Sequence, residues 1–157
     1  MKNIAIKRLA VLVLFTTVLI NAYSQETVVI KESGIADITI VVKDTGFGDI
    51  GVLFKDSGFA DISVGITNNK RNAHFILKHT GFGDRSVVLK SWGIADISIL
   101  TKDFGFADVS ILITKTGFAD YLIYSDKEEV TNAEIIAALV EVIKAKAKDK
   151  RRKAFAV

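Results

Sequence analysis

Gly58-Phe-Ala-Asp61 is the stretch that decides the fold, because close variants of it recur through the middle of the chain. The other copies are Gly34-Ile-Ala-Asp37, Gly46-Phe-Gly-Asp49, Gly81-Phe-Gly-Asp84, Gly93-Ile-Ala-Asp96, Gly105-Phe-Ala-Asp108 and Gly117-Phe-Ala-Asp120. Successive glycines lie 12, 12, 23, 12, 12 and 12 residues apart. A fixed period of this kind indicates a tandem repeat, in which each unit is one supersecondary element.

Each repeat predicts one β-strand. Numbered from the glycine as position 1, positions 5, 7 and 9 are mostly apolar, as in Ile62, Val64 and Ile66. A period of two is typical of a strand with one buried face. Position 6 is mostly Ser, Thr or Gly and is expected to face outward, and a lysine at position 10 commonly closes the strand.

The segment between strands predicts a turn, for example Asp56-Ser-Gly-Phe-Ala60. Glycine suits a backbone with positive φ, and Asp and Ser side chains bond to nearby backbone N–H groups. The fourth repeat has Asn69-Lys-Arg-Asn72 in place of the motif and one residue fewer. Because asparagine tolerates left-handed geometry, the same turn is expected there.

The strands can assemble in more than one way. In an antiparallel meander, identical loops give no net stagger, which disfavours a closed barrel. A single open sheet would leave its apolar face in water, so a second layer is needed. We therefore expect an all-β fold in which the repeats form a two-layer β-solenoid-like stack. The alternative is an antiparallel meander folded into a sandwich.

The block Ala60-Asp-Ile-Ser-Val64, repeated as Ala95-Asp-Ile-Ser-Ile99, carries a resemblance. The region from about residue 30 to 126 resembles a family of short exported bacterial proteins of unknown function, built from 12-residue β repeats that contain Ala-Asp. The resemblance implies no activity and no functional residues.

Residues 1–24 are predicted to be a secretory signal peptide. A basic start precedes the apolar run from Leu9 to Ile20, and Ala22-Tyr-Ser24 resembles a cleavage site. A membrane anchor is the alternative, although the run is short for a span. The protein is then periplasmic or extracellular. Since it has no cysteine, its stability must come from packing.

Residues 127–157 predict a C-terminal amphipathic helix with a basic tail, following the β-repeat domain at 25–126. Thr131-Asn-Ala-Glu134 reads as a capping box, and an apolar face follows. The helix is expected from about Asn132 to Lys148 or beyond, capping an open end of the stack. Seven basic residues lie between Lys144 and Lys153, so residues 144–153 could instead contact a cell-envelope component or an anionic membrane surface.

Few residues suggest chemistry. The position 4 aspartates could hold Ca²⁺, but they lack the dense spacing of a calcium loop, and bonds to the turn backbone or to the position 10 lysines are favoured. His74 and His79 show no catalytic or zinc-binding pattern. The position 2 phenylalanines could form an exposed aromatic ladder, but closing the ends of the core is favoured.

We therefore expect no catalytic residues, no cofactor, no metal and no nucleic-acid partner. Residues 25–143 hold 11 basic and 17 acidic residues, a poor match for a polyanion. The predicted function is a non-enzymatic structural or surface-interaction role. The alternative is an anionic-lipid-binding protein that acts through the basic helix.

Overall fold

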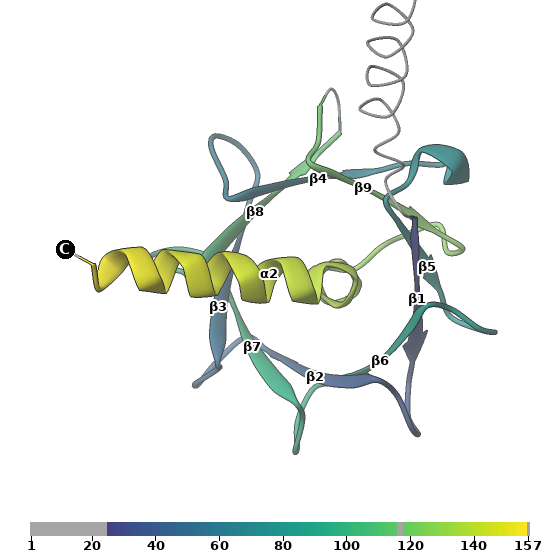
Figure 1. Ribbon diagram of the computed structural model, residues 1–157, viewed down its shortest axis with the longest axis horizontal. Helices are drawn as coiled ribbons and strands as arrows, with labels where there is room; N and C mark the ends of the chain where they lie inside the picture. The colour runs from purple at the N-terminus through teal and green to yellow at the C-terminus, as the bar shows by residue number, and fades with distance from the viewer. Residues whose placement is uncertain (1–24, 116–117, 157) are drawn as a thin grey trace, which may run out of the picture.

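The computed structural model describes residues 25–115 and 118–156, so the predicted signal peptide lies outside the described residues. The described residues form a closed barrel of nine strands, and a helix begins inside it and extends beyond the ring (Figure 1). The elements are, in chain order, β1 (Glu26–Lys31), β2 (Ile38–Lys43), β3 (Ile50–Lys55), β4 (Ile62–Ile66), the 3₁₀ turn η1 (Lys70–Asn72), β5 (Phe75–Lys78), β6 (Arg85–Lys90), β7 (Ile97–Lys102), β8 (Val109–Thr114), β9 (Tyr121–Ser125) and α2 (Asn132–Ala154).

The barrel strands are all parallel, and consecutive strands are not neighbours. The order around the barrel is β1-β5-β9-β4-β8-β3-β7-β2-β6. Thus β7 lies between β2 and β3, and the chain circles the barrel almost twice while it lays down the nine strands. The predicted mainly-β class with a C-terminal helix is confirmed, and the antiparallel meander is not the arrangement.

A large offset between strands makes this winding possible. Val42, near the end of β2, and Ile50, at the start of β3, both pair with Ile99 of β7. The start of β3 therefore lies level with the end of β2. A parallel connection usually needs a dozen or more residues, because the chain must run back along the strand. Here the six residues 44–49 are enough.

The prediction that a closed barrel is disfavoured was wrong, because it did not allow for this offset between parallel strands. It assumed antiparallel strands, whose alternating directions cancel the offset of each loop. In this barrel every neighbouring pair is offset in the same sense, as Ile38 with Val87 and Ile62 with Ile111 illustrate. Because the stagger accumulates around the ring, the sheet closes on itself.

The core fills the inside of the barrel. Position 5 and position 7 side chains line it, and Ile40, Val52, Val64 and Ile99 are fully buried. The first two turns of α2 enter this space, and Ile135 to Val140 are buried. The helix therefore fills the barrel instead of capping an end of a stack, and it provides the second layer that the strands need (Figure 1).

The turns run along the outer face of the barrel. A Cβ atom added at Gly48 would meet Leu100 of β7 at 2.8–3.0 Å, and one added at Gly83 would meet Val29 of β1 at 2.7 Å. Position 3 thus packs on position 8 of the neighbouring strand, which explains why only Ala or Gly occupies it in the seven repeats that begin with Gly. Position 8 is buried or half-buried as a result, and Val41 has no exposed surface.

Local predictions are confirmed at the turns and at the helix start, with one exception. The position 1 glycines in the described residues have positive φ, 84° at Gly58. The Thr131–Glu134 capping box is present. The degenerate fourth repeat instead forms η1, and no non-glycine residue in the described chain has positive φ, so the expectation of a left-handed asparagine was wrong.

Changing Ile99 to Ala is expected to lower the free energy of unfolding by about 2–5 kcal/mol, because it leaves a cavity in a closely packed layer. Ile94 in the same repeat is 92% exposed. Its change to Ala is the control, with an expected effect of about 0.5 kcal/mol or less. Chemical denaturation measures both variants, and equal losses would contradict the packing described above.

Candidate functional site

The position 4 aspartates bind the strands together. Each carboxylate accepts a hydrogen bond from the backbone N–H at position 6 of the neighbouring strand, at 2.6–2.7 Å. The seven pairs are Asp37–Ser86, Asp49–Ser98, Asp61–Ser110, Asp84–Thr27, Asp96–Thr39, Asp108–Gly51 and Asp120–Ser63. The prediction of a bond to the turn backbone was therefore wrong, because the donor is the backbone of a neighbouring strand.

Serine at position 6 makes this contact reciprocal. Ser98 donates its N–H and its hydroxyl to the Asp49 carboxylate at 2.7 and 2.8 Å. The Asp49 N–H in turn donates to the Ser98 carbonyl oxygen at 2.8 Å. The N–H and then the hydroxyl of Ser98 hold the pKa of the Asp49 carboxyl below its ordinary value of 3.8. These carboxylates are therefore structural anions.

The fourth repeat has Asn72 in place of the aspartate, and a histidine two residues later makes the equivalent contact. Its strand neighbour β9 presents the N–H of Leu122, which donates to Nδ1 of His74 at 2.9 Å. His74 thus takes the place of the missing carboxylate, and its Nδ1 carries no proton in this arrangement.

The aspartates do not gather into a metal site. In residues 25–115 and 118–156, no group of three or more His, Cys, Asp or Glu side chains could hold a metal ion. Each carboxylate sits on its own strand and faces the backbone of the next one. A calcium ion needs six to eight oxygen ligands around one point, which one carboxylate per strand does not supply.

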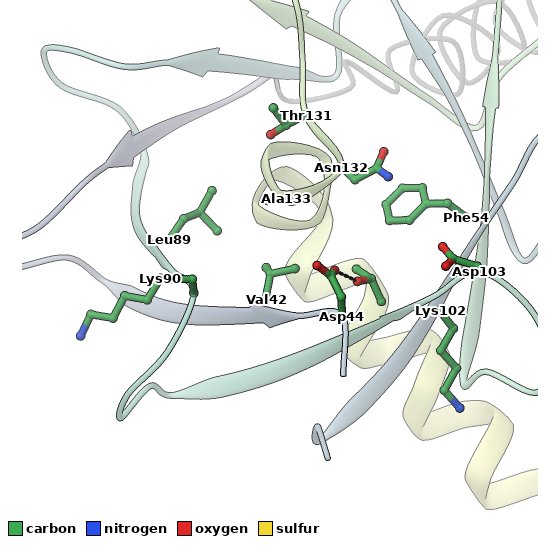
Figure 2. A pocket seen from close by; sticks show the side chains of 12 residues that line it. Val42, Asp44, Phe54, Leu89, Lys90, Lys102, Asp103, Thr131, Asn132 and Ala133 are labelled. Carbon is green, nitrogen blue, oxygen red and sulfur yellow. Dashed lines mark hydrogen bonds between the residues drawn. The ribbon is translucent and has the colours of Figure 1, made fainter. Parts of the chain in front are cut away.

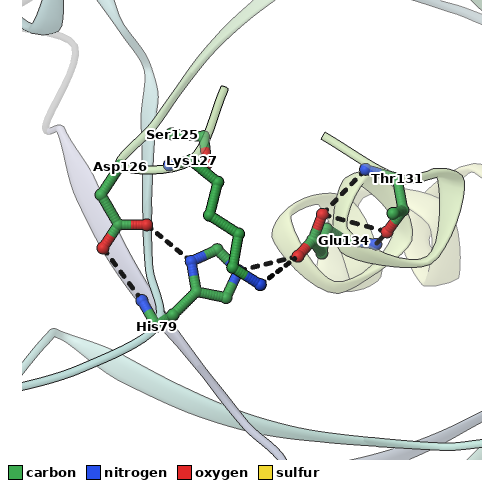
Figure 3. A network of polar contacts seen from close by, with 6 residues as sticks. All are labelled: His79, Ser125, Asp126, Lys127, Thr131 and Glu134. Carbon is green, nitrogen blue, oxygen red and sulfur yellow. Dashed lines mark hydrogen bonds and ion pairs between the residues drawn. The ribbon is translucent and has the colours of Figure 1, made fainter. Parts of the chain in front are cut away.

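A polar network anchors the start of α2 (Figure 3). The His79 ring lies between two carboxylates, with Nδ1 at 2.6 Å from Asp126 and Nε2 at 2.7 Å from Glu134. Glu134 is buried and also accepts the Thr131 N–H at 2.8 Å. Since both ring nitrogens contact carboxylates, neither can activate a nucleophile. The network therefore fixes the helix start and does not form a catalytic triad.

Arg85 provides a second anchor inside the barrel. It occupies position 5, where most repeats have an apolar residue, and its side chain is 13% exposed. Its guanidinium donates to the Ala138 carbonyl oxygen at 2.8 Å and pairs with Glu26 at 2.9 Å. Sequence reasoning missed this role, although a lone arginine at an inward position was the available signal.

A hollow of about 540 Å³ opens beside the start of α2 (Figure 2). Val42, Phe54 and Leu89 form its apolar wall, and they are only half-buried because the helix begins below them. Position 9 is therefore less buried than predicted. The Thr101 hydroxyl donates to Asp44 at 2.6 Å across the rim, and Lys90 and Lys102 point away from the hollow. Its polar groups do not converge on one point, as they do in typical ligand sites.

The position 10 lysines hold the turns in shape. Lys55 donates to the Phe59 carbonyl oxygen at 2.7 Å, and Lys102 donates to that of Phe106 at 2.6 Å. Lys31, Lys78 and Lys90 make the equivalent bond to position 2. The ammonium group thus ties the position 2 backbone of the turn to the end of the preceding strand, while the position 2 side chain remains exposed to solvent.

Among the described residues, the position 2 side chains are the most exposed large apolar groups. We call them the apolar tips: Ile35 (92% exposed), Phe47 (95%), Phe59 (98%), Phe82 (95%), Ile94 (92%), Phe106 (98%) and Phe118 (103%). The interpretation that they close the ends of the core was wrong. The turns that carry them run outside the barrel, so these side chains cannot reach the interior.

The apolar tips follow one another around the barrel. The turns after β5, β1, β6, β2, β7, β3 and β8 carry them, and these strands are consecutive in the ring. The turn after β4 has Lys70 at position 2, and the segment after β9 leads into α2. Figure 1 shows the turns projecting outward around the ring. The tips therefore form one continuous arc.

The basic end of α2 returns to the barrel wall. Arg151 bonds the Asp108 carboxylate at 2.9 Å and the Asp49 carbonyl oxygen at 2.6 Å. Lys150 lies 3.4 Å from Asp61. The Lys144, Lys146, Lys148 and Arg152 side chains are exposed. Part of the basic tail thus neutralises the aspartates, and the described helix is not long and apolar enough to cross a membrane.

Comparison with protein-family models, with curated proteins and with solved structures finds no match for this chain. The resemblance to exported repeat proteins stays a prediction.

The aspartate ladder predicts loss of stability in acid. Hydrogen bonds to the position 6 residues lower the pKa of Asp37, Asp49 and Asp120 below 3.8. Such groups stabilise the fold above the unfolded-state pKa, and this contribution is lost as the pH falls through the lower folded-state pKa. We expect the melting temperature to stay level down to about pH 4 and then to fall.

The matched variant changes all three residues to Asn, which keeps the side-chain shape and removes the titration. Its melting temperature is expected to be lower at neutral pH and to change less between about pH 4 and about pH 2. Thermal melts followed by circular dichroism measure both proteins. Identical acid profiles would show that other carboxylates control the acid sensitivity.

Proposed function

We propose that this chain is an exported repeat protein with a structural or surface-interaction role and no catalytic activity. Its 12-residue units are proposed to be repeats that wind like a β-solenoid closed into a barrel. Parallel pairing throughout the ring and the same turn contacts in successive repeats support this interpretation. Export rests on the basic and apolar pattern of residues 1–24.

The arc of apolar tips is the observation that carries the proposed role. Burying a Phe or Ile side chain is worth about 1.5–3 kcal/mol, so seven exposed ones are unfavourable in water unless something covers them. Contiguous apolar groups on a surface commonly mark a site of interaction. In contrast, the side chains that could do chemistry form hydrogen bonds within the fold, as Asp49 and His79 do.

The tips can be removed without a change in the core, because they contact solvent. In a triple variant, Phe47→Ser, Phe59→Ser and Phe106→Ser remove three tips from consecutive turns. The mature chain, residues 25–157, is expected to bind isolated cell envelope, and the triple variant is expected to bind about tenfold less tightly. Co-sedimentation with the envelope fraction measures the binding.

Phe155→Ser is the control, because Phe155 is 90% exposed but lies at the end of α2. It is expected to bind like the unchanged protein. Circular dichroism melts of all variants check that the barrel is intact. If the triple variant binds as well as the control, the tips do not carry the interaction.

A second candidate function is binding to anionic lipid through the basic helix. The exposed Lys146, Lys148 and Arg152 side chains favour it. The apolar face of the helix, including Leu139 and Ile143, is buried in the barrel, so electrostatic attraction would have to provide the contact.

Vesicles that contain phosphatidylserine test this second candidate. If the second candidate holds, the mature chain binds these vesicles at low salt. A variant with Lys146→Gln, Lys148→Gln and Arg152→Gln, which keeps every apolar tip, then loses the binding. Equal binding by the unchanged chain and the Gln variant would exclude it.

A further inference from the structure

Grooves lie beside several of the turns that carry the apolar tips. One groove of about 660 Å³ lies between the turns after β2 and β7, and its lining includes Thr45, Gly46 and Leu100. Others of about 590 and 670 Å³ lie beside the turns after β3 and β6, where they include Leu112 and Trp92. Each groove thus has apolar side chains at its sides and is large enough to accept a phenyl ring.

The turns that carry the tips recur regularly around the arc. Neighbouring strands in the arc have the same register, since position 5 of one strand faces position 7 of the next in Ile50–Ile99 and in Val109–Val52. The turns, and the spaces between them, therefore recur at one interval. Two such barrels placed side by side can mesh, with tips of each copy in the grooves of the other.

The charges in the grooves also match those of a second copy. The groove after β2 contains Asp44, Lys102 and Asp103, and the groove beside β3 contains Lys55, Asp56 and Lys115. Acidic and basic side chains stand side by side in both. A surface of mixed sign can pair with a rotated copy of itself, whereas an anionic lipid surface would favour a basic one.

We propose that copies of this chain associate side by side through the arc, with the apolar tips of one barrel inserted between the turns of the next. The partner in the surface interaction is then a second copy of this chain. This inference rests on the proposed surface role and specifies the partner that covers the apolar tips. The turn after β4, which includes Arg71, and the segment after β9 carry no tip, so this sector is expected to take no part in the association.

Sedimentation velocity of the purified mature chain over a wide range of concentrations tests the proposal. The unchanged protein is expected to associate reversibly, and the triple tip variant is expected to raise the dissociation constant by at least about tenfold. Phe155→Ser is the control and is expected to associate normally. An unchanged protein that stays monomeric throughout would overturn the proposal.

A second variant separates meshing from unspecific apolar contact. Thr45→Arg places a long charged side chain in an exposed groove wall and leaves every tip in place. If tips enter grooves, this variant also associates at least about tenfold more weakly. If it associates like the unchanged protein, tips do not enter this groove and the proposal fails.

Comparison with the envelope assay distinguishes this inference from the proposed function. Tip-dependent binding of a monomeric protein to envelope would support the surface role while excluding self-association. Tip-dependent self-association without envelope binding would support the present inference and limit the role to a structural one.

Discussion

The offset between neighbouring parallel strands is the constraint on which this barrel depends. Val42 and Ile50 lie on either side of Ile99, although they belong to consecutive strands. The offset lets a six-residue turn join two parallel strands, and it leaves room for a third strand between them. Because each pair is offset in the same sense, the sheet tilts and closes around a space wide enough for a helix.

The repeated residues of the turn follow from that geometry. A chain that must return outside its own barrel wall has to pass over a neighbouring strand, so position 3 is small. The lysine at the strand end ties the turn to itself, as Lys55 does with Phe59. Position 4 then ties the turn to the next strand, as Asp49 does with Ser98. The outside of the barrel is thus a hydrogen-bonded layer from which the tips project into solvent.

This division of roles bears on function. The interior is closed by α2, whose start is held by contacts with His79 and Arg85. The outside presents the same apolar group in turn after turn, in reach of solvent. The regular, accessible features of this protein thus lie on its circumference, and the proposed contact with another surface rests on them.

The sequence by itself determined the local elements. The period of two in Ile62-Ser-Val64, the glycine at position 58 and the Thr131–Glu134 box specify a strand, a turn and a helix start through contacts within a few residues. Only the tertiary structure decided which strands are neighbours, where α2 packs and whether Phe59 is inside or outside. Because the repeats are nearly identical, their residues do not specify which strands pair. The pairing depends instead on the offset that accumulates around the whole ring. Whether a side chain in a turn points into or away from the barrel then depends on which strands that turn crosses.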